Sequence, residues 1–199
     1  MHQYLLFLLI LILWLPVSSF VEWAFHRYVM HRPFGLFAYP FRDHALGHHR
    51  VFRADHTYHL SKPADRGAIL MGWWSGPVLS LIGALPALPL ALASENWVIY
   101  WGAASGAALY YCAYQYLHWC MHVPKGRTIE KKQWFRRLNA HHLLHHRYMH
   151  RNFNVVLPLA DVLLGTFIER ARTRFTQPNS PAVPDVQPVK ARVSAEVRA

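Results

Sequence analysis

Ten histidines of this chain fall into four tight groups whose spacing is typical of metal ligands. The groups are His26-x4-His31, His44-x3-His48-His49, His118-x3-His122 and His142-x2-His145-His146. Neutral imidazole is the commonest metal ligand in proteins, and it suits zinc, copper, iron and nickel. A lone histidine is usually a surface or interfacial residue. Four such groups, each beside a long apolar run, predict a site for more than one metal ion at a membrane surface.

The spacing within each group indicates how its imidazoles can share a face. His118 and His122 are four residues apart, so they stack on one side of a helix. His142, His145 and His146 can also face one metal pocket if their segment is helical. The first and last histidines of the other two groups are five residues apart, which is about 140° around an ideal helix, so a helix end or a distortion is expected there. Ten imidazoles suffice for two metals with four or five nitrogen ligands each.

Three stretches without a charged residue are long enough to cross a bilayer as helices. They are residues 4–21, 69–93 and 97–117. All 21 Lys and Arg lie outside them, seven from residue 27 to residue 66 and 14 from residue 125 to residue 198. This distribution follows the positive-inside rule and places both basic segments, with the histidines, in the cytoplasm. The net charge of +11 therefore indicates a membrane protein, and no nucleic-acid partner is expected.

These stretches predict an all-α integral membrane bundle of three to four transmembrane helices, with a cytosolic histidine-rich cap. Pro77, Pro86 and Pro89 interrupt the middle stretch, whose 25 residues are too few for two spans, so one kinked span is expected. A complete hairpin there would put the third histidine group on the opposite side, and a shallow re-entrant bend is the remaining alternative. The first stretch lacks a basic region and a cleavage site, so it is predicted to be retained.

The membrane domain is predicted to extend over residues 1–175. Within it, residues 130–149 combine aromatic and leucine side chains with basic ones, which predicts an amphipathic helix along the headgroups. Residues 176–199 are rich in proline and poor in large apolar side chains, so they are predicted to form a disordered tail.

Other polar residues have weaker claims on the site. Glu22 lies one turn before His26, and two interpretations are open: it accepts the second N–H of His26 and orients that ring, or it pairs with an arginine at the interface. Asp161 and Asn154 either support the last histidine group or order the turn that follows it. Five further histidines have weaker claims as ligands: His2, His56, His59, His141 and His150. Whether His56, His59 and His150 participate is open, and the alternative is that they make supporting or headgroup contacts.

As a set, the four groups and the ending Asn152-Phe153-Asn154 … Pro158 … Asp161 … Gly165-Thr166 resemble the integral-membrane fatty-acid hydroxylase and sterol desaturase superfamily. The resemblance covers residues 20–170. It implies that two iron ions, which zinc can replace in a preparation, are held at the cytosolic face of a helix bundle. It also implies O2-dependent hydroxylation or desaturation of a lipid C–H bond, on a fatty-acyl or sterol-like substrate, in a bacterial inner membrane. The ligands it implies are His26, His31, His44, His48, His49, His118, His122, His142, His145 and His146.

Two details depart from the commonest pattern of that superfamily. Three residues separate His44 from the following histidine pair, where two are commoner in fatty-acid 2-hydroxylases. No cytochrome b5-like segment is part of the sequence, so electrons are expected from a separate ferredoxin- or cytochrome b5-like donor with its reductase. Three short segments are also similar to bacterial carotenoid hydroxylases, so a carotenoid is the alternative substrate. They are Glu22-Trp23, residues 26–31 and residues 123–126.

A metal transporter or sensor is the competing class of function. Transport through a bilayer needs polar or ionisable groups near its centre. The second and third apolar stretches contain no charged residue, and the histidines gather at one surface, where they can bind a metal but not conduct it. A structural membrane protein with histidine contacts to headgroups is the third class, and it predicts no bound metal.

Overall fold

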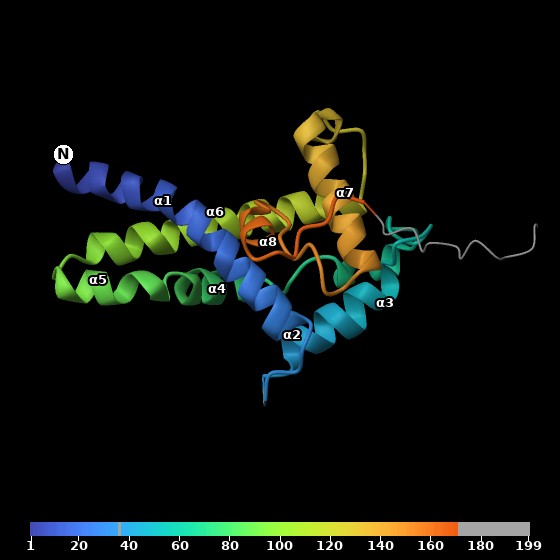
Figure 1. Cartoon of the computed structure of the whole chain (residues 1–199), viewed down its shortest axis with the longest axis horizontal. Coiled ribbons are helices and arrows are strands. Elements are labelled where there is room, and N and C mark those ends of the chain that lie inside the picture. The colour runs from blue at the N-terminus through green and yellow to red at the C-terminus, as the bar shows by residue number, and fades with distance from the viewer. Residues whose placement is uncertain (36, 171–199) are drawn as a thin grey trace, which may run out of the picture.

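The computed structural model describes residues 1–35 and 37–170, which form helices joined by turns (Figure 1). The longer helices are α1 (His2–Phe25), α4 (Ser75–Gly83), α5 (Leu88–Ala93), α6 (Trp97–His122) and α7 (Gln133–Arg147). The short ones are α2 (Tyr39–Phe41), α3 (His49–Val51) and α8 (Leu159–Leu163). Within the described ranges no strand forms, and the predicted all-α class is confirmed. The predicted tail, residues 176–199, lies outside the described residues.

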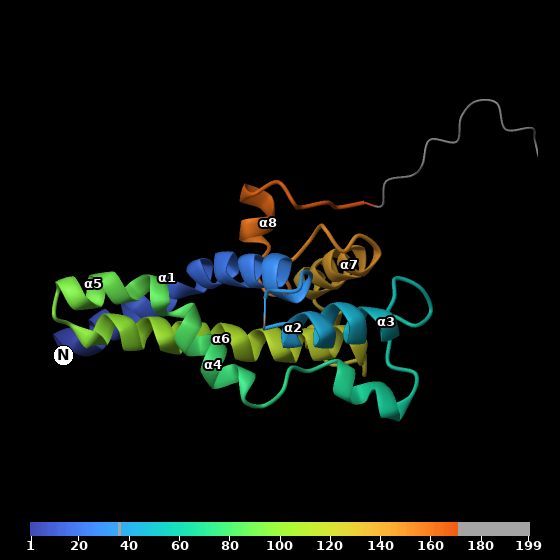
Figure 2. The ribbon, with the colours of Figure 1, turned by 90° about the horizontal axis from the view of Figure 1, so that it is seen from below.

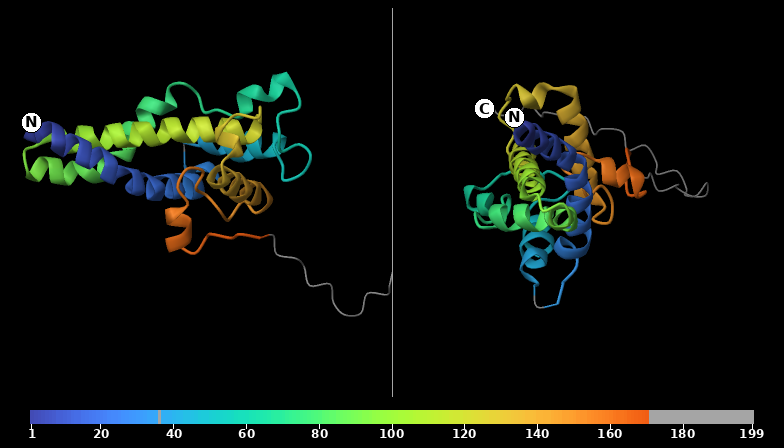
Figure 3. Two further views of the ribbon diagram at one scale, coloured as in Figure 1. Left: turned by 90° about the horizontal axis from the view of Figure 1, so that it is seen from above. Right: turned by 90° about the vertical axis from the view of Figure 1, so that its left-hand side faces the viewer.

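The molecule is elongated, with α1, α4, α5 and α6 forming a bundle at one end (Figures 1 and 2). The other end carries α2, α3 and α7, and these helices gather around the last turns of α1 and α6. Figure 3 shows α1 and α6 side by side when the molecule is viewed along its long axis. Because α1 and α6 end in the same region, they bring the first and third histidine groups together.

Two helical segments are long and apolar enough to cross a membrane, His2–Met30 and Ser75–Ala93. The second is one kinked helix, as expected, because α4 passes through a 3-10 turn (Leu85–Ala87) into α5 without folding back. α6 has 26 residues but is less apolar, so it is not among them, and the predicted count of three to four spans is not confirmed. Apolar side chains on the first half of α1 remain exposed, which suits a lipid environment: Leu5, Leu8, Leu9, Ile12 and Leu13.

Small residues allow α1 and α6 to pack closely. A Cβ added at Gly106 would lie 2.6 Å from the carbonyl oxygen of Leu11, and one added at Gly102 would lie 3.0 Å from the Cβ of Ile10. The Gly-x3-Gly spacing of α6 therefore serves contacts within the chain, where the backbones approach each other. On another side of α6, Ala84, Ala87 and Ala91 of the kinked helix form a buried cluster with Ile99, Ala103 and Ala104.

We expect Gly106→Ala to destabilise the protein, because its methyl group meets the backbone of α1 and the two helices must separate. Overpacking of this kind costs about 1–3 kcal/mol, which lowers the Tm of a chain of this size by roughly 2–12 °C. The matched control is Gly67→Ala, where nothing lies within 4 Å of the added Cβ. Thermal unfolding in detergent measures both, and equal Tm values for the two variants would contradict this account of the α1–α6 contact.

Candidate metal centre

The ten predicted ligands converge into two groups of five. The first group comprises His26, His31, His44, His49 and His145, and the second comprises His48, His118, His122, His142 and His146. Within each group the ligand nitrogens all lie within 4.8 Å of one another. Nine of the ten side chains are buried, and His31 is half-buried. The division does not follow the sequence groups, since His44 and His48 separate, as do His145 and His146.

Two π-helical turns explain the five-residue spacings. One turn spans His26–Met30 and the other spans Arg42–His48. A π-turn is closed by a hydrogen bond between residues five apart, so these residues come to the same side of the chain. The backbone N–H of His31 donates to the carbonyl of His26 at 3.1 Å, and the two imidazoles stack with centroids 5.0 Å apart. The Nε2 atoms of His44 and His49 are likewise 3.0 Å apart. The expected helix distortion is therefore present in both groups.

Backbone carbonyls orient five of the ten rings through Nδ1. His26 donates to Phe153, His48 to Ala68, His122 to Tyr58, His145 to Arg151 and His146 to Phe52. The last four of these distances lie between 2.6 and 2.8 Å. A carbonyl can only accept, so each of these rings carries its proton on Nδ1 and presents a bare Nε2. This is the usual arrangement of a metal-ligating histidine, in which an outer partner fixes the tautomer.

The bare Nε2 atoms face one another in a way that suits a cation. The Nε2 atoms of His48 and His146 are 3.2 Å apart, and neither carries a hydrogen, so no hydrogen bond can form between them. In the first group, His26 and His145 also present bare Nε2 atoms, and the ligand nitrogens of this group lie within 4.8 Å of one another. A positive ion between such lone pairs converts their repulsion into coordination. The donor set of each group therefore fits a divalent metal of the kind that imidazole binds.

Burial keeps these imidazoles neutral. It lowers the pKa of His145 to about 4, although the hydrogen bond to Arg151 acts in the opposite direction. Burial, followed by the neighbouring imidazoles, also holds the pKa values of His142 and His146 well below the ordinary 6.5. Neutral imidazole is the form that binds metal, so the site is ready to bind at neutral pH.

These pKa values make the stability of the metal-free protein depend on pH. Between pH 6.5 and about 4 the folded chain binds fewer protons than the unfolded chain at His145. Stability is therefore full above pH 6.5 and decreases as the pH falls toward 4. We expect the Tm in the presence of a chelator to decrease by on the order of 10 °C between pH 7.5 and pH 5. Calorimetry measures this change, and a Tm that rises as the pH falls would contradict the buried, neutral state of these rings.

The remaining histidines of the described chain do not join either group. His141 donates from Nε2 to Asp161 at 3.0 Å, and Nδ1 of His59 lies 3.1 Å from the carbonyl of Met121. His56 is exposed beside Asp55, and His150 lies near the ring of Tyr148. His2 is exposed in the first turn of α1.

The structure contradicts both interpretations of Glu22. Its carboxylate does not accept from His26, whose Nδ1 donates to the carbonyl of Phe153. It accepts instead from the hydroxyl of Tyr110 at 2.7 Å, from the backbone N–H of Val155 at 2.8 Å and from Asn154 Nδ2 at 2.9 Å. Two of these partners lie more than 130 positions away in the chain, so the sequence near Glu22 could not indicate them.

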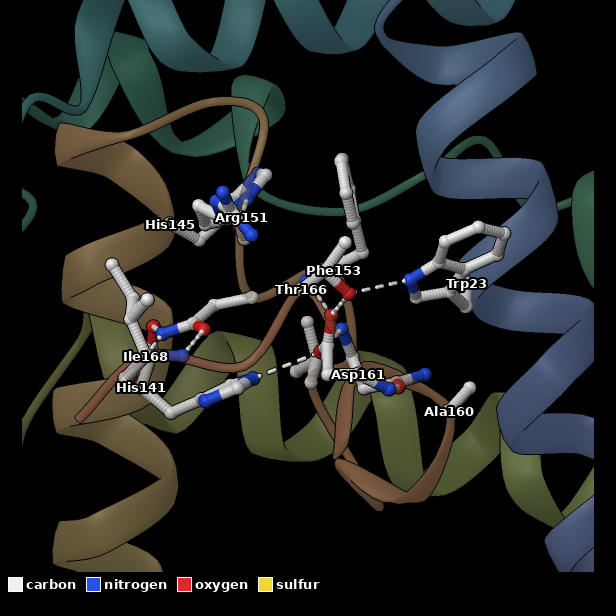
Figure 4. Close-up of polar contacts among 12 residues, drawn as sticks. Trp23, His141, His145, Arg151, Phe153, Ala160, Asp161, Thr166 and Ile168 are labelled. Carbon is white, nitrogen blue, oxygen red and sulfur yellow. Dashed lines mark hydrogen bonds and ion pairs between the residues drawn. The ribbon is translucent and has the colours of Figure 1, made fainter. Parts of the chain in front are cut away.

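Asp161 organises the loop that follows α7 (Figure 4). The carboxylate is fully buried and accepts from the backbone N–H groups of Phe153 at 2.9 Å and Asn154 at 2.7 Å. It also accepts from the hydroxyl of Thr166 at 2.6 Å and from His141. Burial alone would raise the pKa of Asp161, but these hydrogen bonds outweigh it and lower the pKa, so the group is a carboxylate. The expected ordering of this turn is therefore present.

An apolar cavity of about 630 Å³, open space included, lies between α1, α4 and α6. His26 and Met30 line one part of it, and Gly83 and Ala107 line another. Ala107 lies on α6, 11 residues before His118, which is about 16 Å along the helix axis. A second hollow shares several of its lining residues and adds Tyr39, Asp43 and Trp74 near α2. The lining of the cavity is mostly apolar, which suits a hydrocarbon chain.

The comparison with known families agrees with this geometry. The model of the fatty acid hydroxylase family matches residues 10–166, a range that contains all ten histidines and the loop around Asp161. This chain belongs to the fatty acid hydroxylase family. The comparisons with curated proteins and with solved structures found no match. As a fatty acid hydroxylase family member, the chain is assigned to the oxidoreductases that act on lipids, and the predicted resemblance is confirmed at the level of the family.

Proposed function

We propose that the protein is a membrane-bound non-haem di-iron oxygenase that hydroxylates a C–H bond of a lipid, most simply a fatty-acyl or sterol-like substrate. This proposal rests on the position of the apolar cavity next to the first five-imidazole group. His26 belongs to that group and also lines the cavity. A hydrocarbon chain in the cavity lies beside that group. Membership of the fatty acid hydroxylase family supports the reaction class.

The residues of the chain have distinct parts in this reaction. The ten imidazoles hold two iron ions, five for each ion, and the wall of the cavity, including Val21, Phe25 and Leu79, binds the hydrocarbon and excludes water. The chemistry that bound iron supplies is the reductive activation of O2. In the overall reaction the lipid C–H becomes C–OH, the second oxygen atom leaves as water, and two electrons and two protons are consumed. The electrons come from a separate donor, ferredoxin- or cytochrome b5-like, with its reductase.

We propose further that α6 is the third membrane span. Its neighbours α1 and the kinked α4–α5 helix are apolar enough to cross, and α6 packs along both of them. Arginine and lysine concentrate around the histidine-bearing segments, which supports a cytoplasmic metal site in a bacterial inner membrane. The electron donor then reaches the protein from the same side.

The reconstituted protein tests this function. Purified membranes that contain the chain receive iron, a ferredoxin or cytochrome b5 with its reductase, and isotopically labelled O2. Fatty-acyl, sterol and carotenoid lipids are offered separately. We expect two irons per chain and one labelled oxygen atom in a fatty-acyl or sterol product. A carotenoid product would select the alternative substrate, and a new double bond without labelled oxygen would indicate desaturation. An iron-loaded protein that converts none of the three lipid classes would contradict the proposal.

A further inference from the structure

The two imidazole groups are oriented by different segments of the backbone. In the first group, the rings that donate to carbonyls are His26 and His145, and their acceptors are Phe153 and Arg151. In the second group, the acceptors of His48, His122 and His146 all lie between residues 52 and 68. The C-terminal loop, residues 151–168, therefore contacts the first group, and the segment 52–68 contacts the second. Neither segment provides a carbonyl for a ring of the other group among these five hydrogen bonds.

Asp161 holds the C-terminal loop in the conformation that presents these carbonyls. Its two oxygens accept from the N–H groups of Phe153 and Asn154, so the peptide units on either side of residue 153 are fixed. The hydroxyl of Thr166 donates to Asp161 Oδ1 at 2.6 Å and accepts from Trp23 Nε1 at 2.8 Å, which joins the loop to α1 (Figure 4). His141 on α7 donates to the other oxygen.

Glu22 fixes the next part of the same loop. It accepts from the N–H of Val155 and from the side chain of Asn154. Asn154 also donates to the carbonyl of Ser19 at 2.8 Å and accepts from the N–H of Asp161 at 3.1 Å. Three consecutive N–H groups, at residues 153 to 155, are therefore bound by the side chains of Asp161 and Glu22. Asp161, whose pKa these hydrogen bonds lower, is the strong anchor of the two, because charged hydrogen bonds are about twice as strong as neutral ones.

We infer that Asp161 is a positioning residue for one of the two metal ions only, the ion held by His26, His31, His44, His49 and His145. It acts directly on the peptide unit that carries the carbonyl of Phe153. It acts on the carbonyl of Arg151 through Thr166, which donates to Asp161 and whose carbonyl accepts from the N–H of Asn152. These two carbonyls fix the tautomer and orientation of His26 and His145. The inference rests on the proposed binding of two metal ions by the ten imidazoles. As a consequence, the affinity for each ion can be lowered separately, because the second group is oriented by residues 52–68.

Zinc binding to the metal-free, full-length protein in detergent tests this inference, with Zn²⁺ alone as the probe and a competing chelator to resolve the two affinities. We expect the unaltered protein to bind two ions. In Asp161→Asn the amide presents an N–H group to backbone donors, the loop loosens, and one ion binds about 10–100-fold more weakly. The other ion keeps its affinity. Thr166→Val, which removes the hydroxyl but keeps the side-chain volume, produces a smaller change of the same kind, and Thr166→Ser restores binding.

Double variants identify which ion is affected. His31→Ala removes a ligand of the first group and His118→Ala removes one of the second. We expect the double variant Asp161→Asn, His31→Ala to bind zinc like His31→Ala alone. The double variant Asp161→Asn, His118→Ala should bind both ions more weakly than the unaltered protein. If Asp161→Asn does not fold, the Thr166 variants give the same comparison. Equal weakening of both ions, or of neither, would overturn the inference. Absence of zinc binding by the unaltered protein would instead contradict the proposed metal centre itself.

Discussion

His142→Ala is expected to reduce hydroxylation at least about 100-fold and to lower the metal content from two ions per chain to one. The Nε2 of His142 lies 3.1 Å from that of His122 and 3.0 Å from that of His146, so its loss removes one of five converging donors from the second group. The side chain is fully buried, so water cannot replace the imidazole without rearrangement. Metal analysis of the purified variant and turnover in reconstituted membranes measure the two effects.

The control for His142→Ala is the same substitution at His56. The side chain of His56 is 91% exposed and belongs to neither group. We expect His56→Ala to keep both ions and activity within about twofold of the unaltered protein, as is usual for surface substitutions. His142→Asn, which fills more of the space than alanine, separates lost ligation from a cavity. Full metal content and activity in both His142 variants would remove this residue from the site.

Gly83→Leu is expected to lower kcat/KM for long-chain substrates by about 10–100-fold while both metal ions remain bound. A Cβ at Gly83 would lie 3.4 Å from the Cβ of Ala107 and 3.8 Å from Val21 Cγ1, and all three residues line the cavity. A leucine side chain there therefore occupies space that the proposed hydrocarbon needs. The effect should increase with chain length, because a short chain can remain near His26 without reaching Gly83.

The control for Gly83→Leu adds bulk to the same bundle but not to the cavity. Leu109 is exposed on α6 and does not line the cavity, so Leu109→Trp tests added volume alone. Product analysis with substrates of several lengths measures both variants. Equal loss for short and long substrates, or equal loss in Leu109→Trp, would show that the cavity does not hold the reacting chain.

The ten candidate ligands could be named from the sequence, but their division into two groups of five could not. Ligand spacing identified the histidines because residues four apart share a helical face. The assignment of neighbours such as His48 and His49 to different ions depends on the π-turn at Arg42–His48 and on how α6 and α7 approach it. Such turns have no strong sequence signal, although the five-residue spacing did indicate a distortion.

The carbonyls that orient the rings could not be predicted, because a backbone acceptor has no side-chain signature. The partners of the Glu22 side chain were also predicted wrongly. It was interpreted from its neighbour His26, one turn along the helix, whereas its hydrogen bonds join it to Asn154 and Val155 in the C-terminal loop. Apolar runs predicted α1 and the kinked helix well. For α6, small residues such as Gly102 and Gly106, which pack against α1, lower the mean hydropathy, so only its length and its lack of charged residues predicted a span.

Diffraction from crystals of the zinc- or iron-loaded protein at the metal absorption edge tests the central claim most directly. We expect two anomalous peaks per chain, one within each five-imidazole group, with Nε2 atoms at about 2.0–2.1 Å from a bound zinc ion. Density that places His26 and His145 on one ion and His48 and His146 on the other would agree with the partition described above. A single peak, or peaks away from these rings, would contradict the two-metal site.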